Sequence, residues 1–188
     1  DESNRVYDAA GKLIYSGGPS RTNPMFEERF GSDLSKWKDN AAGSSVTSGK
    51  LSVENNRVVF AKGGSDWKNY FLEAEVTCKS EVAIPGLVFC ADDSGKNYYR
   101  NYRSTIDIYK VVNGTENTSP LASYPCYSML KETAYKIRIE LKDSSIQVYM
   151  DGNLIGTLTD AAFSKGTVGL ANGHSGMALF DNLIVCPL

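Results

Sequence analysis

The stretch Phe71-Leu72-Glu73-Ala74-Glu75-Val76-Thr77-Cys78 decides the fold, because apolar and polar residues alternate along it from position 72 onward. Neighbouring residues of a strand point to opposite faces, so the apolar set would face a core and the glutamates the other side. Segments 135–141 and 145–150 alternate in the same way, and 180–185 closes the series. Turn-forming residues recur roughly every 8–12 residues, as in β-sandwiches. The sequence therefore predicts an all-β protein, a two-sheet antiparallel β-sandwich of jelly-roll type.

The size and charge of the chain exclude several classes of protein. Its 188 residues suit one sandwich. Its 20 basic and 22 acidic residues give a formal net charge of −2. No basic block is present, so we expect no nucleic-acid partner. No apolar run approaches the ~20 residues of a membrane helix, so we expect no membrane span.

Residues 1–24 differ from the rest of the chain. Segments 5–7 and 12–15 could pair as one small hairpin, and Ser16-Gly17-Gly18-Pro19-Ser20 then interrupts regular structure. We interpret residues 1–24 as an N-terminal extension or edge hairpin, and residues 25–188 as the jelly-roll domain. The single helical indication is Asp160-Ala161-Ala162-Phe163, which suggests one turn.

The four cysteines leave two alternatives open. Cys78, Cys90, Cys126 and Cys186 are widely spaced, and none forms a CxxC pair, so a zinc site or a thioredoxin-like motif is not expected. They could form two disulfides in a secreted protein, or remain free as small buried apolar residues.

The order of several segments resembles a known family. The segments are Trp37, 50–53, 67–76, 86–89, 97–100, 149–152, 166–170 and 180–182. In this order they resemble the concanavalin A-like lectin/glucanase jelly roll. Within that superfamily, the chain is similar to laminin-G-like and fructan-binding modules appended to bacterial glycoside hydrolases. The resemblance covers about residues 25–186. It implies a lectin-like sandwich, extracellular or at the cell surface, in a superfamily with both glycan-binding and catalytic members.

The residues give little support for catalysis. A glycosidase needs two carboxylates facing one cleft, and the Glu-x-Asp-x-x-Glu strand pattern of the superfamily is missing. Glu73 and Glu75 are the nearest substitute, and we interpret them as a solvated outer face. A nucleophilic triad is not indicated, because His174 is the single histidine and no Gly-x-Ser-x-Gly elbow occurs. The sequence favours a noncatalytic protein without deciding the point.

The densest aromatic and guanidinium segment is residues 98–103. Sugar binding needs an aromatic face for the apolar side of a ring and planar polar groups for its hydroxyls. Tyr98, Arg100 and Tyr102 share one strand face, and the other face carries Tyr99 and Arg103. One face could instead be core and the other an ordinary polar surface. The candidate ligand-binding residues are Trp67, Asp92, Tyr99, Arg100, Arg103, Asp107, Tyr109 and His174, with His174 alternatively a plain loop residue and Asp92 part of an ordinary turn.

The resemblance also implies a structural Ca²⁺ between the first and last strands. Calcium takes hard oxygen ligands, and Glu27 or Glu28 with Asp181 would supply them here. Alternatively, Asp181 caps a turn or accepts an internal hydrogen bond.

Three functions follow from the resemblance and the residues. The first is a noncatalytic carbohydrate-binding module or accessory domain of extracellular polysaccharide degradation. Its partners would be an oligo- or polysaccharide and a larger multidomain glycoside hydrolase. The alternatives are a glycan-active hydrolase of the same fold and a laminin-G-like adhesion domain that binds a protein.

Overall fold

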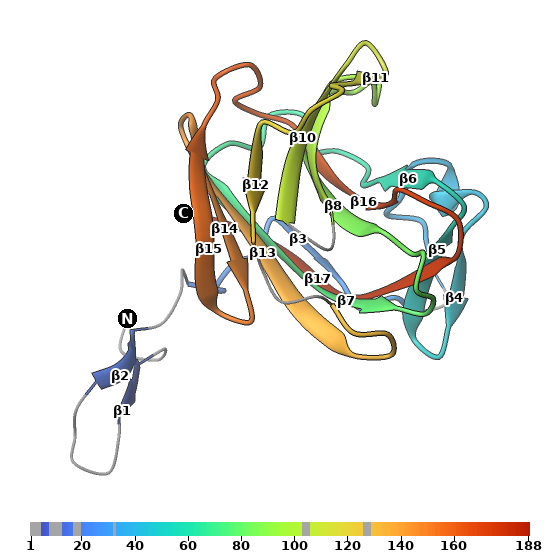
Figure 1. Cartoon of the computed structure of the whole chain (residues 1–188), viewed down its shortest axis with the longest axis horizontal. Helices are drawn as coiled ribbons and strands as arrows, with labels where there is room; N and C mark the ends of the chain where they lie inside the picture. Colours follow the sequence, from blue (N-terminus) through green and yellow to red (C-terminus); the bar gives the residue numbers. More distant parts are fainter. Residues whose placement is uncertain (1–4, 8–12, 17–19, 32, 103–105, 126–128) are drawn as a thin grey trace.

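The computed structural model describes residues 5–7, 13–16, 20–31, 33–102, 106–125 and 129–188. Two antiparallel sheets pack face to face (Figure 1). The two-sheet jelly-roll prediction is confirmed. The described part of the chain contains no helix long and apolar enough to cross a membrane.

The first sheet has seven strands. Their order is β11 (Thr115–Glu116), β10 (Ile106–Val112), β9 (Tyr98–Tyr102), β8 (Pro85–Ala91), β16 (Thr167–Asn172) and β6 (Arg57–Phe60), with β12 (Ala122–Tyr124) beside β10. The second sheet has eight strands. Their order is β15 (Asn153–Thr159), β14 (Ser145–Met150), β13 (Ala134–Lys142), β7 (Tyr70–Cys78), β17 (Met177–Pro187), β5 (Lys50–Glu54) and β4 (Ser45–Thr47), with β3 (Phe26–Glu28) beside β17.

The core between the sheets follows the alternation read from the sequence. Leu72, Ala74 and Val76 of β7 are buried in it. Trp37, predicted as core, is fully buried, and its ring stacks on Phe30 with centroids 5.7 Å apart. Edge-to-face and stacked rings of this kind add to the stabilisation that burial itself provides.

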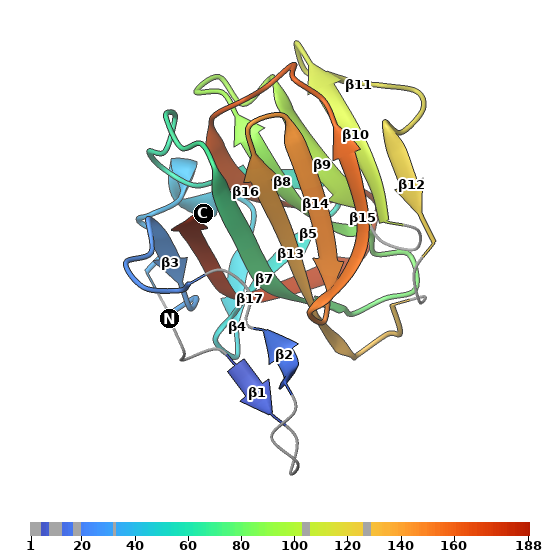
Figure 2. The ribbon, with the colours of Figure 1, turned by 90° about the vertical axis from the view of Figure 1, so that its left-hand side faces the viewer.

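The two sheets are curved in the same sense. Figure 1 shows the seven-stranded sheet lying inside the curve of the eight-stranded sheet. The outer face of the seven-stranded sheet is therefore concave, and we call it the concave face. The outer face of the eight-stranded sheet, which Figure 2 shows toward the viewer, is the convex face.

The N-terminal segment contains two paired strands outside the sandwich. β1 (Arg5–Tyr7) pairs with β2 (Leu13–Ser16) in a separate two-stranded sheet. Arg21, from the segment that follows, contacts Glu73 of β7 through an ion pair. The segment before residue 25 therefore contacts the convex face.

One local expectation is wrong, and several short elements were not predicted. Asp160–Phe163 is not helical, because Asp160 Oδ1 accepts hydrogen bonds from the backbone N–H of Ala162 and the Tyr99 hydroxyl, which fix a bend. A short 3₁₀ helix lies instead at Lys38–Ala41. The strands β4, β11 and β12, of two or three residues each, are too short for a periodic signal and went unpredicted.

The cysteines do not form two disulfides. Cys90 and Cys186 are buried free thiols, which excludes a second bridge. Burial raises the pKa of the Cys90 thiol to about 12, and a hydrogen bond with Tyr70 opposes that shift only partly. This thiol therefore stays protonated and unreactive at neutral pH. Cys126 lies outside the described residues.

Candidate functional site

Strand β9 divides the candidate residues between its two faces. Tyr99 is fully buried in the core, where its ring stacks on Phe89 at 5.4 Å between centroids. Tyr98, Arg100 and Tyr102 alternate with it and point to the concave face. Tyr98 belongs to a small apolar cluster separate from the main core. The face of β9 that carries Arg100 therefore points outward, and the face that carries Tyr99 points into the core.

Strand register brings further side chains to the same place. Arg100 pairs with Tyr109 across β9 and β10, and Val111 pairs with Glu116 across β10 and β11. The connection between β10 and β11 is the Asn113-Gly114 turn, in which both residues have positive φ, as a tight hairpin requires. The turn therefore sets Glu116 on the concave face, beside Arg100.

These residues form one connected group, which we call the concave-face cluster: Arg100, Tyr102, Tyr109 and Glu116. Arg100 Nε donates to Glu116 Oε2 at 2.5 Å, and its guanidinium lies 4.4 Å from the centroid of the Tyr102 ring. The Tyr102 hydroxyl donates to Glu116 Oε2 at 3.3 Å. The Tyr102 and Tyr109 rings meet at 64° with centroids 5.3 Å apart. Each side chain is thus held by at least one other.

Apolar side chains support the cluster from β6 and β8. Val88 lies opposite Arg100 in the register and is fully buried. Phe60 packs edge-on against Tyr98, with ring centroids 5.5 Å apart. Only 12% of the Arg100 side chain is exposed, and Tyr102 and Tyr109 are likewise partly buried. The surface offered to a ligand therefore combines two partly exposed tyrosines with a largely covered guanidinium.

Within the cluster, the charges of Arg100 and Glu116 balance each other. The neighbouring Asp107 carboxylate lies opposite Tyr102 in the register and accepts a hydrogen bond from the Ser123 hydroxyl at 2.5 Å. Burial and the nearby carboxylates of Asp107 and Glu116 raise the pKa of Tyr109, against the opposing effect of Arg100. The tyrosine is neutral at physiological pH. Such a surface can stack an apolar ring face and exchange hydrogen bonds with neutral hydroxyls.

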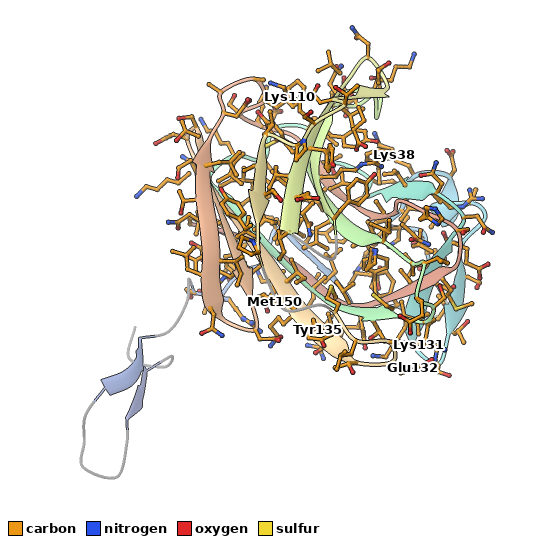
Figure 3. The ribbon with its side chains drawn as sticks, viewed as in Figure 1. Lys38, Lys110, Lys131, Glu132, Tyr135 and Met150 are labelled. Carbon is orange, nitrogen blue, oxygen red and sulfur yellow. The ribbon has the colours of Figure 1, made fainter. Side chains whose placement is uncertain are left out.

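Other predicted ligand residues lie elsewhere. Tyr99 is wrong as a ligand contact, because its side chain is in the core and its hydroxyl bonds Asp160 and the backbone N–H of Phe163. Lys110 completes that network with an ion pair to Asp160 at 3.0 Å. Lys110 and Glu132 lie at opposite ends of the sandwich (Figure 3). Arg103 lies outside the described residues.

Three loop residues surround the sheet without joining the cluster. Trp67 is half-buried against Phe26, with ring centroids 6.1 Å apart. Asp92 organises the loop between β8 and β9. Although partial burial raises its pKa, hydrogen bonds from Asn97, Ser94 and two backbone amides lower the value to about 2. His174 is exposed in the loop between β16 and β17, next to Gly173, where an added Cβ would lie 2.3 Å from the Tyr102 ring.

The residues expected to bind Ca²⁺ contact other groups of the protein. Glu27 pairs with Arg29 at 2.8 Å, and Asp181 lies 3.5 Å from Lys50. Glu28 Oε1 accepts two backbone N–H groups. Asp181 Oδ1 accepts the next backbone N–H, as its alternative interpretation anticipated. Throughout the described ranges, no group of three or more His, Cys, Asp or Glu could hold a metal. The calcium prediction gains no support.

Glu73 and Glu75 both lie on the convex face, but the prediction that this face is solvated is wrong at Glu73. Glu73 is 5% exposed and pairs with Arg21, so it is not solvated. The sequence could not reveal this, because Arg21 is 52 residues away in the chain.

Glu116 was also absent from the predicted site residues. The Asn113-Gly114 turn could have identified it, because pairing the residues outward from that turn places Glu116 opposite Val111.

Comparisons with known proteins give likeness in structure alone. Neither a scan against protein-family models nor a search of curated proteins found a match. Among solved structures, the carbohydrate-binding module CBM66 from Bacillus subtilis is 21% identical, with a TM-score of 0.69 over 80% of this chain and 94% of that one. A Bacillus licheniformis β-glucanase is 13% identical, with a TM-score of 0.63 over 89% of this chain and 99% of that one.

A GH43 protein from Bacillus licheniformis shows the same architecture inside a longer chain. It is 15% identical, with a TM-score of 0.63, and the match covers 98% of this chain but 46% of that one. Identities this low establish shared fold and not shared activity. The chain therefore shares the jelly-roll β-sandwich fold of these three proteins.

Proposed function

We propose that the protein is a noncatalytic carbohydrate-binding module or accessory domain of extracellular polysaccharide degradation. The observation that carries the proposal is the concave-face cluster. It combines two partly exposed tyrosine rings with a guanidinium and a carboxylate that hold each other in place. A site whose side chains are ordered before the ligand arrives loses less conformational entropy on binding.

The chemistry of the cluster suits a neutral sugar chain. The Tyr102 and Tyr109 rings offer apolar surface for ring C–H groups, and their hydroxyls can both donate and accept. Because Arg100 is paired with Glu116, an anionic sugar would have to compete with that carboxylate. The curvature of the sheet lets a chain lie along its outer face (Figure 1).

The carboxylates near the cluster argue for binding rather than hydrolysis. Glycosidases need one carboxylic acid and one carboxylate free to react. On the described part of the concave face, Glu116 is held by Arg100 and Asp107 by Ser123. Both carboxylates thus serve as acceptors for neighbouring side chains of the protein.

The setting of the domain follows from the same proposal. Polysaccharide degradation takes place outside cells, so we place the protein there or at the cell surface. The GH43 protein, in which a domain of this fold makes up less than half of the chain, supports a larger multidomain partner.

A glycan array followed by calorimetric titration tests the proposal. We expect binding to at least one neutral glycan, without release of product after long incubation. Arg100→Ala should abolish detectable binding, because it frees Glu116 and removes the support under Tyr102. Product release would instead favour a hydrolase. If no glycan on the array binds and the protein specifically captures another protein, the adhesion alternative is favoured. Product release and this second result would each overturn the proposal.

A further inference from the structure

A pocket of about 480 Å³ lies on the convex face, away from the concave-face cluster. Arg21 and Pro24 of the N-terminal segment form one wall, Glu73 and Glu75 of β7 and Lys136 of β13 another, and Ile184 of β17 contributes apolar surface. We call this the convex-face pocket. Its volume lies within the roughly 300–1,000 Å³ of small-molecule sites.

An irregularity in β17 coincides with the pocket. The register against β7 shifts between Asp181 and Ile184, and Asn182 has φ +49°. A β-bulge bends its strand, interrupts the ladder and re-aims side chains. Asn182 and Leu183, the two residues inside the shift, both line the pocket. The hollow thus arises where the backbone departs from the regular sheet.

The charged groups of the pocket balance one another. Arg21 pairs with Glu73, and Arg29 pairs with Glu27 at 2.8 Å. The remaining two, Glu75 and Lys136, lie directly opposite each other in the register of β7 and β13. The pocket therefore has equal numbers of carboxylates and cations. It is polar and has no net charge.

This balance selects the ligand class. An ion entering the pocket would leave one charge uncompensated or displace the partner of Glu73, a carboxylate that is only 5% exposed, which is costly. A hydroxyl donates to a carboxylate and accepts from an ammonium without changing the net charge. Ile184 and Pro24 offer apolar contact for the C–H face of a ring. A compact neutral polyol matches all three features.

We propose that the convex-face pocket is a second carbohydrate site, which takes a neutral monosaccharide unit against the side chains of Glu75 and Lys136. It deepens the proposed function, because it serves the same ligand class, but it uses a different set of residues. Sites on opposite faces of one module would let it engage two glycan chains at once, which raises avidity without new contacts.

Amide chemical-shift titration of the ¹⁵N-labelled protein tests this site. The probes are D-glucose, D-galactose, D-fructose and N-acetyl-D-glucosamine, used up to concentrations suited to millimolar affinity. We expect at least one sugar to shift the amides of Glu73, Glu75, Lys136 and Ile184. Glu75→Ala and Lys136→Ala should each weaken that effect about tenfold. Gln147→Ala, on the same face outside the pocket, should not.

The outcomes separate this site from the concave-face cluster. Shifts confined to the amides of residues 98–102 and 106–112 would overturn the second site and leave the proposed function standing. Shifts confined to the pocket would support the second site and count against the concave-face cluster. If no probe shifts the pocket amides, or if Lys136→Ala binds like the parent, the pocket is not a sugar site.

Discussion

The two outer faces of the sandwich carry nearly the same arrangement of three side chains. On the concave face the Arg100 guanidinium lies 4.4 Å from the centroid of the Tyr102 ring, and on the convex face Arg138 lies 4.3 Å from that of Tyr149. Each tyrosine hydroxyl oxygen lies near a glutamate carboxylate, 3.3 Å from Glu116 and 3.4 Å from Glu140. The cation–π stack alone therefore does not identify a binding surface.

The surroundings of the two stacks differ. Tyr102 has a second aromatic neighbour in Tyr109, whereas Tyr149 donates to Gln147 at 3.0 Å. The Arg138 side chain is 9% exposed, and Arg138 lies opposite Glu73 in the register. One stack thus belongs to an aromatic surface on a concave sheet, and the other to rows of opposite charges on a convex sheet. Neighbouring rings and curvature distinguish the face that we propose as the main binding surface.

The largest expected effect comes from the close approach of β8 and β9 beneath the concave-face cluster. A Cβ on Gly86 would lie 1.9 Å from the backbone oxygen of Asn101. Gly86→Ala must therefore push the two strands apart, and we expect a loss of about 3 kcal/mol of unfolding free energy. Gly31→Ala, which meets no atom within 4 Å, should change stability by less than about 0.5 kcal/mol. Urea unfolding measures both, and equal stabilities would contradict the crowding.

The two tyrosines provide the most direct test of the comparison. Tyr102→Ala should weaken binding of the best array glycan tenfold or more, because it removes a stacking ring and the partner of Tyr109. Tyr149→Ala removes the matching ring from the convex face and should leave that affinity within about twofold. Isothermal titration of the two folded variants decides the matter. If both variants lose the same affinity for the glycan, the Tyr102 and Tyr149 stacks do not differ in their contribution to binding.

Arg21 tests how far the convex face depends on the N-terminal segment. It pairs with Glu73, which is 5% exposed, so Arg21→Ala leaves a buried carboxylate without that partner. We expect a loss of about 1–2 kcal/mol of unfolding free energy, less than for a fully buried pair because half of the Arg21 side chain is exposed. Adding Glu73→Gln should recover part of it. If the double variant is less stable by the sum of both single losses, the pair is not coupled.

The sequence predicted the sandwich well and the site only in part. Alternation along residues 71–78, 135–141 and 145–150 fixed the faces of β7, β13 and β14, because burial enforces that period. It also placed Arg100 with Tyr102. It did not decide which face of β9 is core, so Tyr99 was included wrongly. It could not identify Arg21 as the partner of Glu73, because that contact depends on how a segment outside the strand pattern crosses the sheet.

The smallest expected effect concerns the loops at the sheet ends, where Asp92 and Asp151 play comparable roles. Asp92 accepts hydrogen bonds from the side chains of Ser94 and Asn97 and from two backbone amides, whereas Asp151 accepts one from the backbone N–H of Lys136. The folded-state pKa of Asp92, about 2, lies below its ordinary value of 3.8.

The charged form of Asp92 therefore stabilises the fold above about pH 4, and that contribution is lost as the pH falls toward 2. Because the loop is largely exposed, we expect Asp92→Asn to cost about 1 kcal/mol or less at pH 6 and almost nothing at pH 2. Asp151→Asn should cost less at pH 6. Urea unfolding at the two pH values measures these differences, and a cost for Asp92→Asn that is unchanged at pH 2 would show that its charge is not what holds the loop.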